Sequence, residues 1–99
     1  MKIVFHPEAY EEMVESARFY EERDEGLGAR FLDAVEDTIK RIRSFPHAGP
    51  VEKADIRKRL VSGFPFTILY QFENDRVYIG AVMHQHRRPG YWRKRFGDA

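Results

Sequence analysis

Residues 7–45, PEAYEEMVESARFYEERDEGLGARFLDAVEDTIKRIRSF, decide the fold, because they contain two amphipathic helical patterns separated by a short break. Pro7 favours the first position of a helix, and the glutamates after it suit the positive end of the helix dipole. The first pattern ends near Arg23, and the second runs from Leu27 to Phe45, directly before Pro46. The apolar stripes comprise Ala9, Met13, Ala17 and Tyr20, and then Leu27, Phe31, Val35, Thr38, Ile42 and Phe45. These spacings predict a helical hairpin.

Strand-like patterns flank the hairpin, and Ser62-Gly63 and Asn74-Asp75 supply turns between them. The predicted strands are Lys2–His6, Ile56–Val61, Phe64–Phe72 and Arg76–His84, with a loop over 47–55 and a short terminal helix over Tyr91–Phe96. In the last strand, Val77, Ile79, Ala81 and Met83 are expected on one face, and Tyr78, Gly80, Val82 and His84 on the other. The order β-α-α-β-β-β predicts an α+β domain whose hairpin covers one face of a mostly antiparallel four-stranded sheet. The other face is expected to remain open to a partner.

Length and composition favour one small folded domain over residues 1–99. The chain is 42% hydrophobic and 33% charged, and it contains no cysteine, which excludes disulfides, thiolate metal sites and a cysteine nucleophile. No apolar run is long enough for a membrane span or a secretion signal, so we expect a cytoplasmic protein without membrane contact. We expect neither a cofactor nor a metal. His84 and His86 are two residues apart, but spacing identifies no third metal ligand.

Charge is distributed unevenly along the chain. Residues 1–50 hold 11 acids and 7 bases, whereas residues 51–99 hold 5 acids and 10 bases. The basic half suits RNA or an acidic protein, and equally a solvated tail that balances the acidic helix. The candidate target-binding residues are Arg57, Arg59, Arg87, Arg88, Trp92, Arg93, Lys94 and Arg95. For Arg57 and Arg59 the alternative is an ion pair with Glu11, Glu15 or Glu22, and for Tyr91 and Trp92 it is burial of one of the two against the core.

Motifs along nearly the whole chain resemble the RelE/ParE toxin family. They are Pro7-Glu8-Ala9, Phe19-Tyr20, Leu27-Gly28 with Phe31, Phe45-Pro46, Phe64-Pro65-Phe66 with Tyr70, Ala81-Val82 with His84, and finally Arg87, Pro89, Tyr91 and Trp92. The resemblance implies the toxin of a type II toxin-antitoxin pair, covered by a cognate antitoxin that is rich in apolar and acidic residues. It also implies contact with operator DNA only through that antitoxin. Apolar surface left open without the antitoxin would allow a homodimer.

Two branches of this family imply different activities. RelE-like members cleave mRNA on the ribosome. Here the candidate acid or base is His84 or His86, and Arg87 and Arg59 would contact the phosphate. Tyr91 would be a further donor or a surface on which a base stacks. ParE-like members poison DNA gyrase without a hydrolytic site. Ser62 occupies a position where RelE-like members carry an arginine, and Lys53 is the only lysine in the preceding loop, so we favour the ParE-like branch. A degenerate member that only binds its antitoxin is a third alternative. For His84 we favour a buried, hydrogen-bonded histidine of the last strand over a catalytic one.

Overall fold

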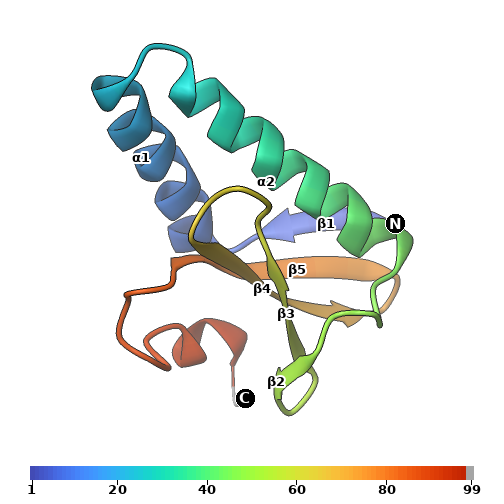
Figure 1. The fold of residues 1–99 in the computed structure, drawn as a ribbon. Coiled ribbons are helices and arrows are strands. Elements are labelled where there is room, and N and C mark those ends of the chain that lie inside the picture. The colour runs from blue at the N-terminus through green and yellow to red at the C-terminus, as the bar shows by residue number, and fades with distance from the viewer. Residues whose placement is uncertain (98–99) are drawn as a thin grey trace.

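The computed structural model describes residues 1–97, which form two helices, five strands and a terminal 3-10 turn (Figure 1). In chain order the elements are β1 (Lys2–Phe5), α1 (Pro7–Arg23), α2 (Leu27–Ser44), β2 (Val51–Lys53), β3 (Ile56–Leu60), β4 (Phe66–Glu73), β5 (Arg76–His84) and η1 (Arg93–Phe96). The strand order is β1-β5-β4-β3-β2, in which only β1 and β5 run parallel. The α+β fold with a mostly antiparallel sheet is therefore confirmed. Within residues 1–97, no helix is both long and apolar enough to cross a membrane.

The helical hairpin forms as the sequence predicts. His6 caps α1 by accepting a hydrogen bond on Nδ1 from the Glu8 amide at 3.0 Å. The helices approach closely at Gly28, where an added Cβ would lie 2.6 Å from the carbonyl oxygen of Ala17. The apolar stripes of both helices pack on Phe66, Ile68, Tyr70, Val77 and Ile79 of the sheet. The predicted stripe is wrong at its end, where Phe45 is 65% exposed.

The sheet differs from the prediction in strand count. Residues 51–53, expected within a loop, form the fifth strand, which pairs with β3 at Ile56 and Arg57. All three residues of β2 are exposed, so it lacks the alternating apolar pattern by which strands are recognised. The predicted terminal helix is also shorter than expected, because the 3-10 turn begins at Arg93 rather than Tyr91.

A bulge in β5 corrects the predicted faces of that strand. Leu69 pairs with Ala81 but Tyr70 pairs with Ile79, which leaves Gly80 as the extra residue. Beyond Gly80 the faces invert, so Val82 joins Val77 and Ile79 beneath the helices, whereas Ala81 lies on the opposite face. The expectation that Ala81 and Met83 share a face with Val77 was therefore wrong.

The second face of the sheet is partly covered by the chain itself. Trp92 and Phe96 pack on Ile56, Leu69 and Ala81 and form a second apolar cluster. Figure 1 shows η1 on the side of the sheet opposite the helical hairpin. This corrects the expectation of an entirely open second face, because the C-terminal aromatics bury apolar surface there.

Candidate functional site

The three predicted catalytic residues lie together. His84, Arg87 and Tyr91 line a pocket of about 140 Å³ at the end of β5, and Glu12 and Glu15 of α1 complete its wall. The pocket therefore combines a histidine, an arginine and a tyrosine with two carboxylates. Carboxylates repel the phosphate groups of RNA, so this composition is unfavourable for a nucleic-acid substrate.

Glu12 organises the pocket through a largely buried network. Its Oε1 accepts a hydrogen bond from the Val82 amide at 3.0 Å, and its Oε2 accepts one from the Tyr91 hydroxyl at 2.7 Å. Arg95 Nη1 lies 3.0 Å from Glu12 Oε1 and donates to the Gly80 carbonyl at 3.1 Å. The side chains of Arg95 and Glu12 are only 11% and 14% exposed. Together they satisfy backbone groups of β5 beside the bulge, beyond the end of β1.

Tyr91 is held in its protonated form by this network. Burial raises the pKa of the Tyr91 hydroxyl, and the hydrogen bond to Glu12 and the negative charge of that residue raise it further. The Cζ atom of Arg87 lies 3.9 Å from the centroid of the Tyr91 ring, which covers the ring by a cation–π contact. Neither the hydroxyl nor the covered part of the ring is therefore free for RNA chemistry.

His84 is also engaged in local contacts. Its Nδ1 accepts a hydrogen bond from the His86 amide at 3.0 Å, and its ring lies 5.1 Å from the ring of Phe66. The side chain is half-buried. Among residues 1–97, no three His, Cys, Asp or Glu side chains gather where they could hold a metal ion.

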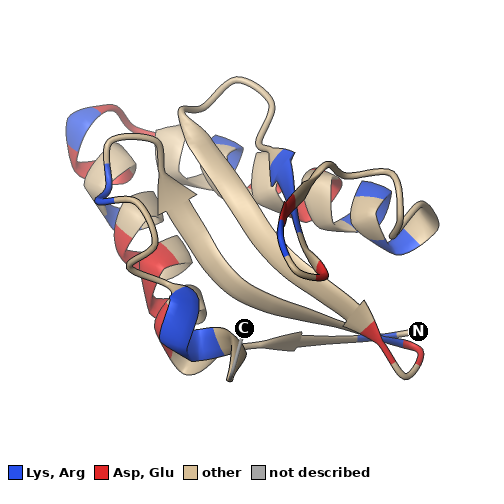
Figure 2. Cartoon of the chain, turned by 90° about the horizontal axis from the view of Figure 1, so that it is seen from below, with Lys and Arg blue, Asp and Glu red and all other residues tan. Residues whose placement is uncertain are grey.

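The predicted target-binding residues divide into buried and exposed groups. Trp92 is 4% exposed and belongs to the second apolar cluster, so its assignment to a partner surface was wrong. Arg95 is bound to Glu8 and Glu12, and Arg57 Nη1 donates to the carbonyls of His47 and Gly49 at 3.0 and 2.8 Å. The exposed members are Arg87, Arg88, Arg93 and Lys94, which we call the C-terminal basic surface. Figure 2 shows the basic residues of η1 beside the acidic turns of α1.

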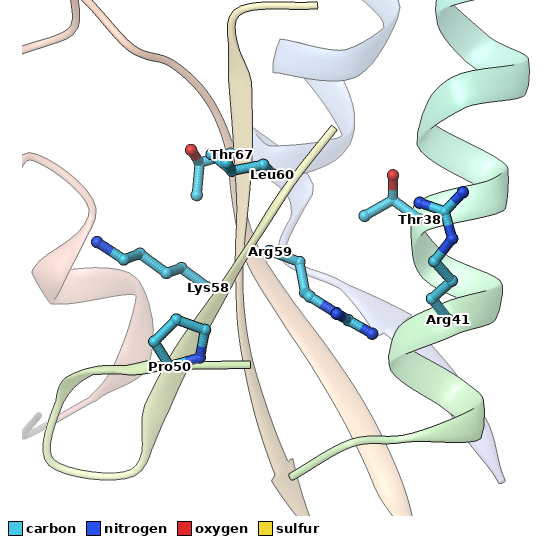
Figure 3. A pocket seen from close by; sticks show the side chains of 7 residues that line it. All are labelled: Thr38, Arg41, Pro50, Lys58, Arg59, Leu60 and Thr67. Atoms are coloured by element: carbon cyan, nitrogen blue, oxygen red, sulfur yellow. The ribbon is translucent and has the colours of Figure 1, made fainter. Parts of the chain in front are cut away.

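Arg59 lies apart from these groups, in a hollow of about 440 Å³ at the edge of β3. Figure 3 shows its side chain extending from β3 toward α2, where Thr38 and Arg41 also line the hollow. Its Nε is buried and has no hydrogen-bond partner within the part of the chain that the structure describes. The alternative ion pairs of Arg57 and Arg59 with Glu11, Glu15 or Glu22 do not form among residues 1–97.

A groove between the helices and β1 is the larger apolar feature, with a volume of about 520 Å³. Its floor consists of Phe5, Met13, Leu32, Val35 and Ile39. Glu36, Lys40 and Arg43 also line it, and Lys40 forms an exposed ion pair with Glu36 at 3.4 Å. An apolar groove suits a segment that carries apolar side chains, and Arg43 at its border suits an acidic group on that segment.

Sequence reasoning missed Glu12 as the centre of the pocket and Arg41 as the neighbour of Arg59. Glu12 had a detectable signal, because it lies three residues after the buried Ala9 and therefore on the core side of α1. Arg41 had none, because its meeting with Arg59 depends on how α2 packs beside β3.

Comparisons with known proteins agree with this architecture. Residues 3–89 match the sequence model of the family described as the ParE toxin of the type II toxin-antitoxin system, parDE. A chain of the chromosomal ParDE toxin-antitoxin system from P. aeruginosa shares the fold with a TM-score of 0.61 and 14% sequence identity. That alignment covers 85% of this chain and 95% of the other. Among curated proteins, no match was found.

Proposed function

The chain is a member of the ParE toxin family of type II toxin-antitoxin systems, and from this premise we infer that it arrests growth by binding DNA gyrase without cleaving nucleic acid, until a cognate antitoxin neutralises it. The observation that carries the non-hydrolytic assignment is the state of the pocket at the end of β5. The Tyr91 hydroxyl donates a hydrogen bond to Glu12, and the carboxylates of Glu12 and Glu15 line the pocket. General acid-base cleavage of RNA needs groups that are free to exchange protons beside a stabilised phosphate.

The C-terminal basic surface is the proposed contact with the target. Arg88, Arg93 and Lys94 are exposed, and none of them forms a salt bridge within residues 1–97. Arg93 and Lys94 are held on η1, because Trp92 and Phe96 pack on the sheet on either side of these two residues. A fixed array of unpaired cations favours binding to an acidic protein surface or to a complex of protein and DNA.

The test combines growth, transcript integrity and gyrase activity. We expect induction of the wild-type chain to arrest growth while transcripts stay intact by primer extension, and the purified chain to inhibit DNA supercoiling by gyrase. The triple variant Arg88→Gln, Arg93→Gln, Lys94→Gln should lose inhibition by at least about tenfold, because it removes three unpaired charges from the contact. A matched control, Lys2→Gln, Arg18→Gln, Arg76→Gln, removes three exposed charges that lie elsewhere and also form no salt bridge within residues 1–97.

Three outcomes would contradict the proposal. Transcript breaks at specific codons that vanish in Arg87→Ala would show that the chain is a ribonuclease. The observation that favours this alternative is that His84, Arg87 and Tyr91 line one pocket. Normal growth on induction would indicate a member that only binds its antitoxin. Equal loss of inhibition in the triple variant and its control would show that gyrase inhibition does not depend specifically on the C-terminal basic surface.

The antitoxin is the second part of the proposal. The apolar groove between the helices and β1 is suited to an amphipathic segment, and its covering would remove exposed apolar surface from solvent. We expect co-expression with the protein encoded beside the toxin to restore growth and to yield a complex of the two chains.

A further inference from the structure

We propose that the hollow at the edge of β3 is a binding site for a small phosphate monoester, whose phosphate group is held by the guanidinium groups of Arg59 and Arg41. The starting observation is the buried Nε of Arg59, which has no hydrogen-bond partner within the described residues. A buried donor on a charged group is costly when it has no acceptor. An anion that enters the hollow from solvent would supply that acceptor.

The hollow carries positive charge that the chain does not neutralise. Neither Arg59 nor Arg41 forms a salt bridge within residues 1–97, and no acidic residue of that range lines the hollow. The third cation, Lys58, is already paired, because its Nζ lies 3.1 Å from Oε1 of Glu52. Two unpaired guanidinium groups remain, and they match a phosphate monoester, which carries about two negative charges at neutral pH.

A backbone amide adds a donor at the same edge. The Val61 amide points toward β4 and donates to the Phe66 carbonyl at 2.9 Å. The Lys58 amide points away from β4 and donates to the Pro50 carbonyl at 3.0 Å. Because hydrogen bonds alternate along an antiparallel strand, the Leu60 amide also points away from β4. The pairing of β2 with β3 stops short of Leu60, so within the described part of the chain no strand covers this amide.

The arrangement and size of the hollow suit a phosphate that is carried by a small organic group. Figure 3 shows the Arg59 side chain reaching from β3 toward α2, which contributes Arg41. Donors from two elements suit the three terminal oxygens of a monoester better than the two coplanar oxygens of a carboxylate. The volume of about 440 Å³ lies within the range of about 300–1,000 Å³ that is typical of small-molecule sites. It leaves room for the group that carries the phosphate, and Pro50 and Leu60 supply apolar walls for that group.

The hollow is separate from the pocket at the end of β5. Among residues 1–97 the two share no lining residue, and the carboxylates of Glu12 and Glu15 are confined to the pocket. Each phosphate of a nucleic-acid backbone is a diester with a single charge, and nucleic acids bind through many such phosphates. The hollow instead offers two unpaired arginines at one place, which favours a free monoester over a strand of RNA or DNA.

Calorimetric titration of the full chain tests the proposal. The probe is adenosine 5′-monophosphate, and the matched control is the cyclic 3′,5′-monophosphate, a diester with the same base and sugar. We expect saturable binding of the monoester and at least about tenfold weaker binding of the diester, which lacks one charge and one terminal oxygen. Inorganic phosphate is the third probe and should bind more weakly than the monoester, because it leaves the apolar walls uncovered.

Variants assign the binding to the hollow. Arg59→Gln should weaken binding of the monoester at least about tenfold, and Arg41→Gln, at an exposed position of α2, should weaken it without a risk to the core. Arg43→Gln is the matched control and should bind as the wild type does, because Arg43 is also exposed on α2 but lines the apolar groove instead. Circular dichroism and Trp92 fluorescence confirm folding of each variant.

The proposal is overturned if adenosine 5′-monophosphate shows no saturable binding, or if the cyclic diester or inorganic phosphate binds as tightly. It is also overturned if Arg59→Gln and Arg41→Gln bind the monoester as well as Arg43→Gln does. The titration uses the chain alone, so failure of this site and failure of the gyrase proposal are separate results.

Discussion

Replacement of Glu12 by glutamine tests whether the buried network holds the C-terminal segment, residues 85–97, in place. The carboxylate has three partners, the Val82 amide, the Tyr91 hydroxyl and Arg95, and the Arg95 side chain is 11% exposed. Removing one member of a buried ion pair costs about 3–5 kcal/mol, because the other charge stays buried without its counter-charge. Glutamine keeps the shape and one acceptor oxygen, and Glu8 Oε2 remains as a counter-charge 3.2 Å from Arg95 Nε. We therefore expect a loss at the lower limit, about 3 kcal/mol.

Urea unfolding followed by two signals measures this loss. Trp92 is the only tryptophan of the chain and lies in the second apolar cluster, so its fluorescence reports on the C-terminal segment. Far-ultraviolet circular dichroism reports mainly on the helices. With a slope of about 1.5 kcal/mol per molar urea, the midpoint of Glu12→Gln should fall by about 2 M. We expect the Trp92 transition to precede the helical one in the variant, because that segment loses its anchor to α1.

Glu11→Gln is the matched control. Glu11 is the exposed neighbour on α1 and forms no salt bridge within residues 1–97, so its replacement should change the free energy of unfolding by less than about 0.5 kcal/mol. A loss below about 1 kcal/mol in Glu12→Gln, similar to that of the control, would refute the reasoning. It would mean that water replaces the carboxylate at little cost.

Two further changes test the same region. Burial and Glu12 raise the pKa of the Tyr91 hydroxyl in the folded state above its ordinary value of 10.0. The group therefore favours folding below that pH and loses its contribution as the pH rises further. The stability of Tyr91→Phe should fall less steeply above pH 10 than that of the wild type, and equal slopes in urea unfolding would contradict this. In Gly80→Ala the new methyl group would collide with the ring of Phe96. We expect a loss of about 1–3 kcal/mol and a red shift of Trp92 emission as the segment is displaced, and unchanged emission would show that the bulge absorbs the methyl group.

The helical hairpin and the antiparallel pairing of β3, β4 and β5 could be predicted because their signals are local. Pro7 begins α1, and the break at Gly26 separates it from α2, so both helix starts follow from the sequence. The faces of β5 beyond Gly80 could not be predicted by alternation, because a bulge adds one residue and inverts the pattern. A glycine inside a strand is a weak sign of such a bulge. Here the ring of Phe96 occupies the space that a side chain at residue 80 would fill.

The site was predicted in part. His84, Arg87 and Tyr91 do line one pocket, because they follow β5 closely in the chain. Their surroundings depend on α1, which contributes Glu12 from 70 residues before Val82. Residue type alone could not show that Trp92 anchors the segment in the core, because a tryptophan among arginines suits either a partner surface or a core contact.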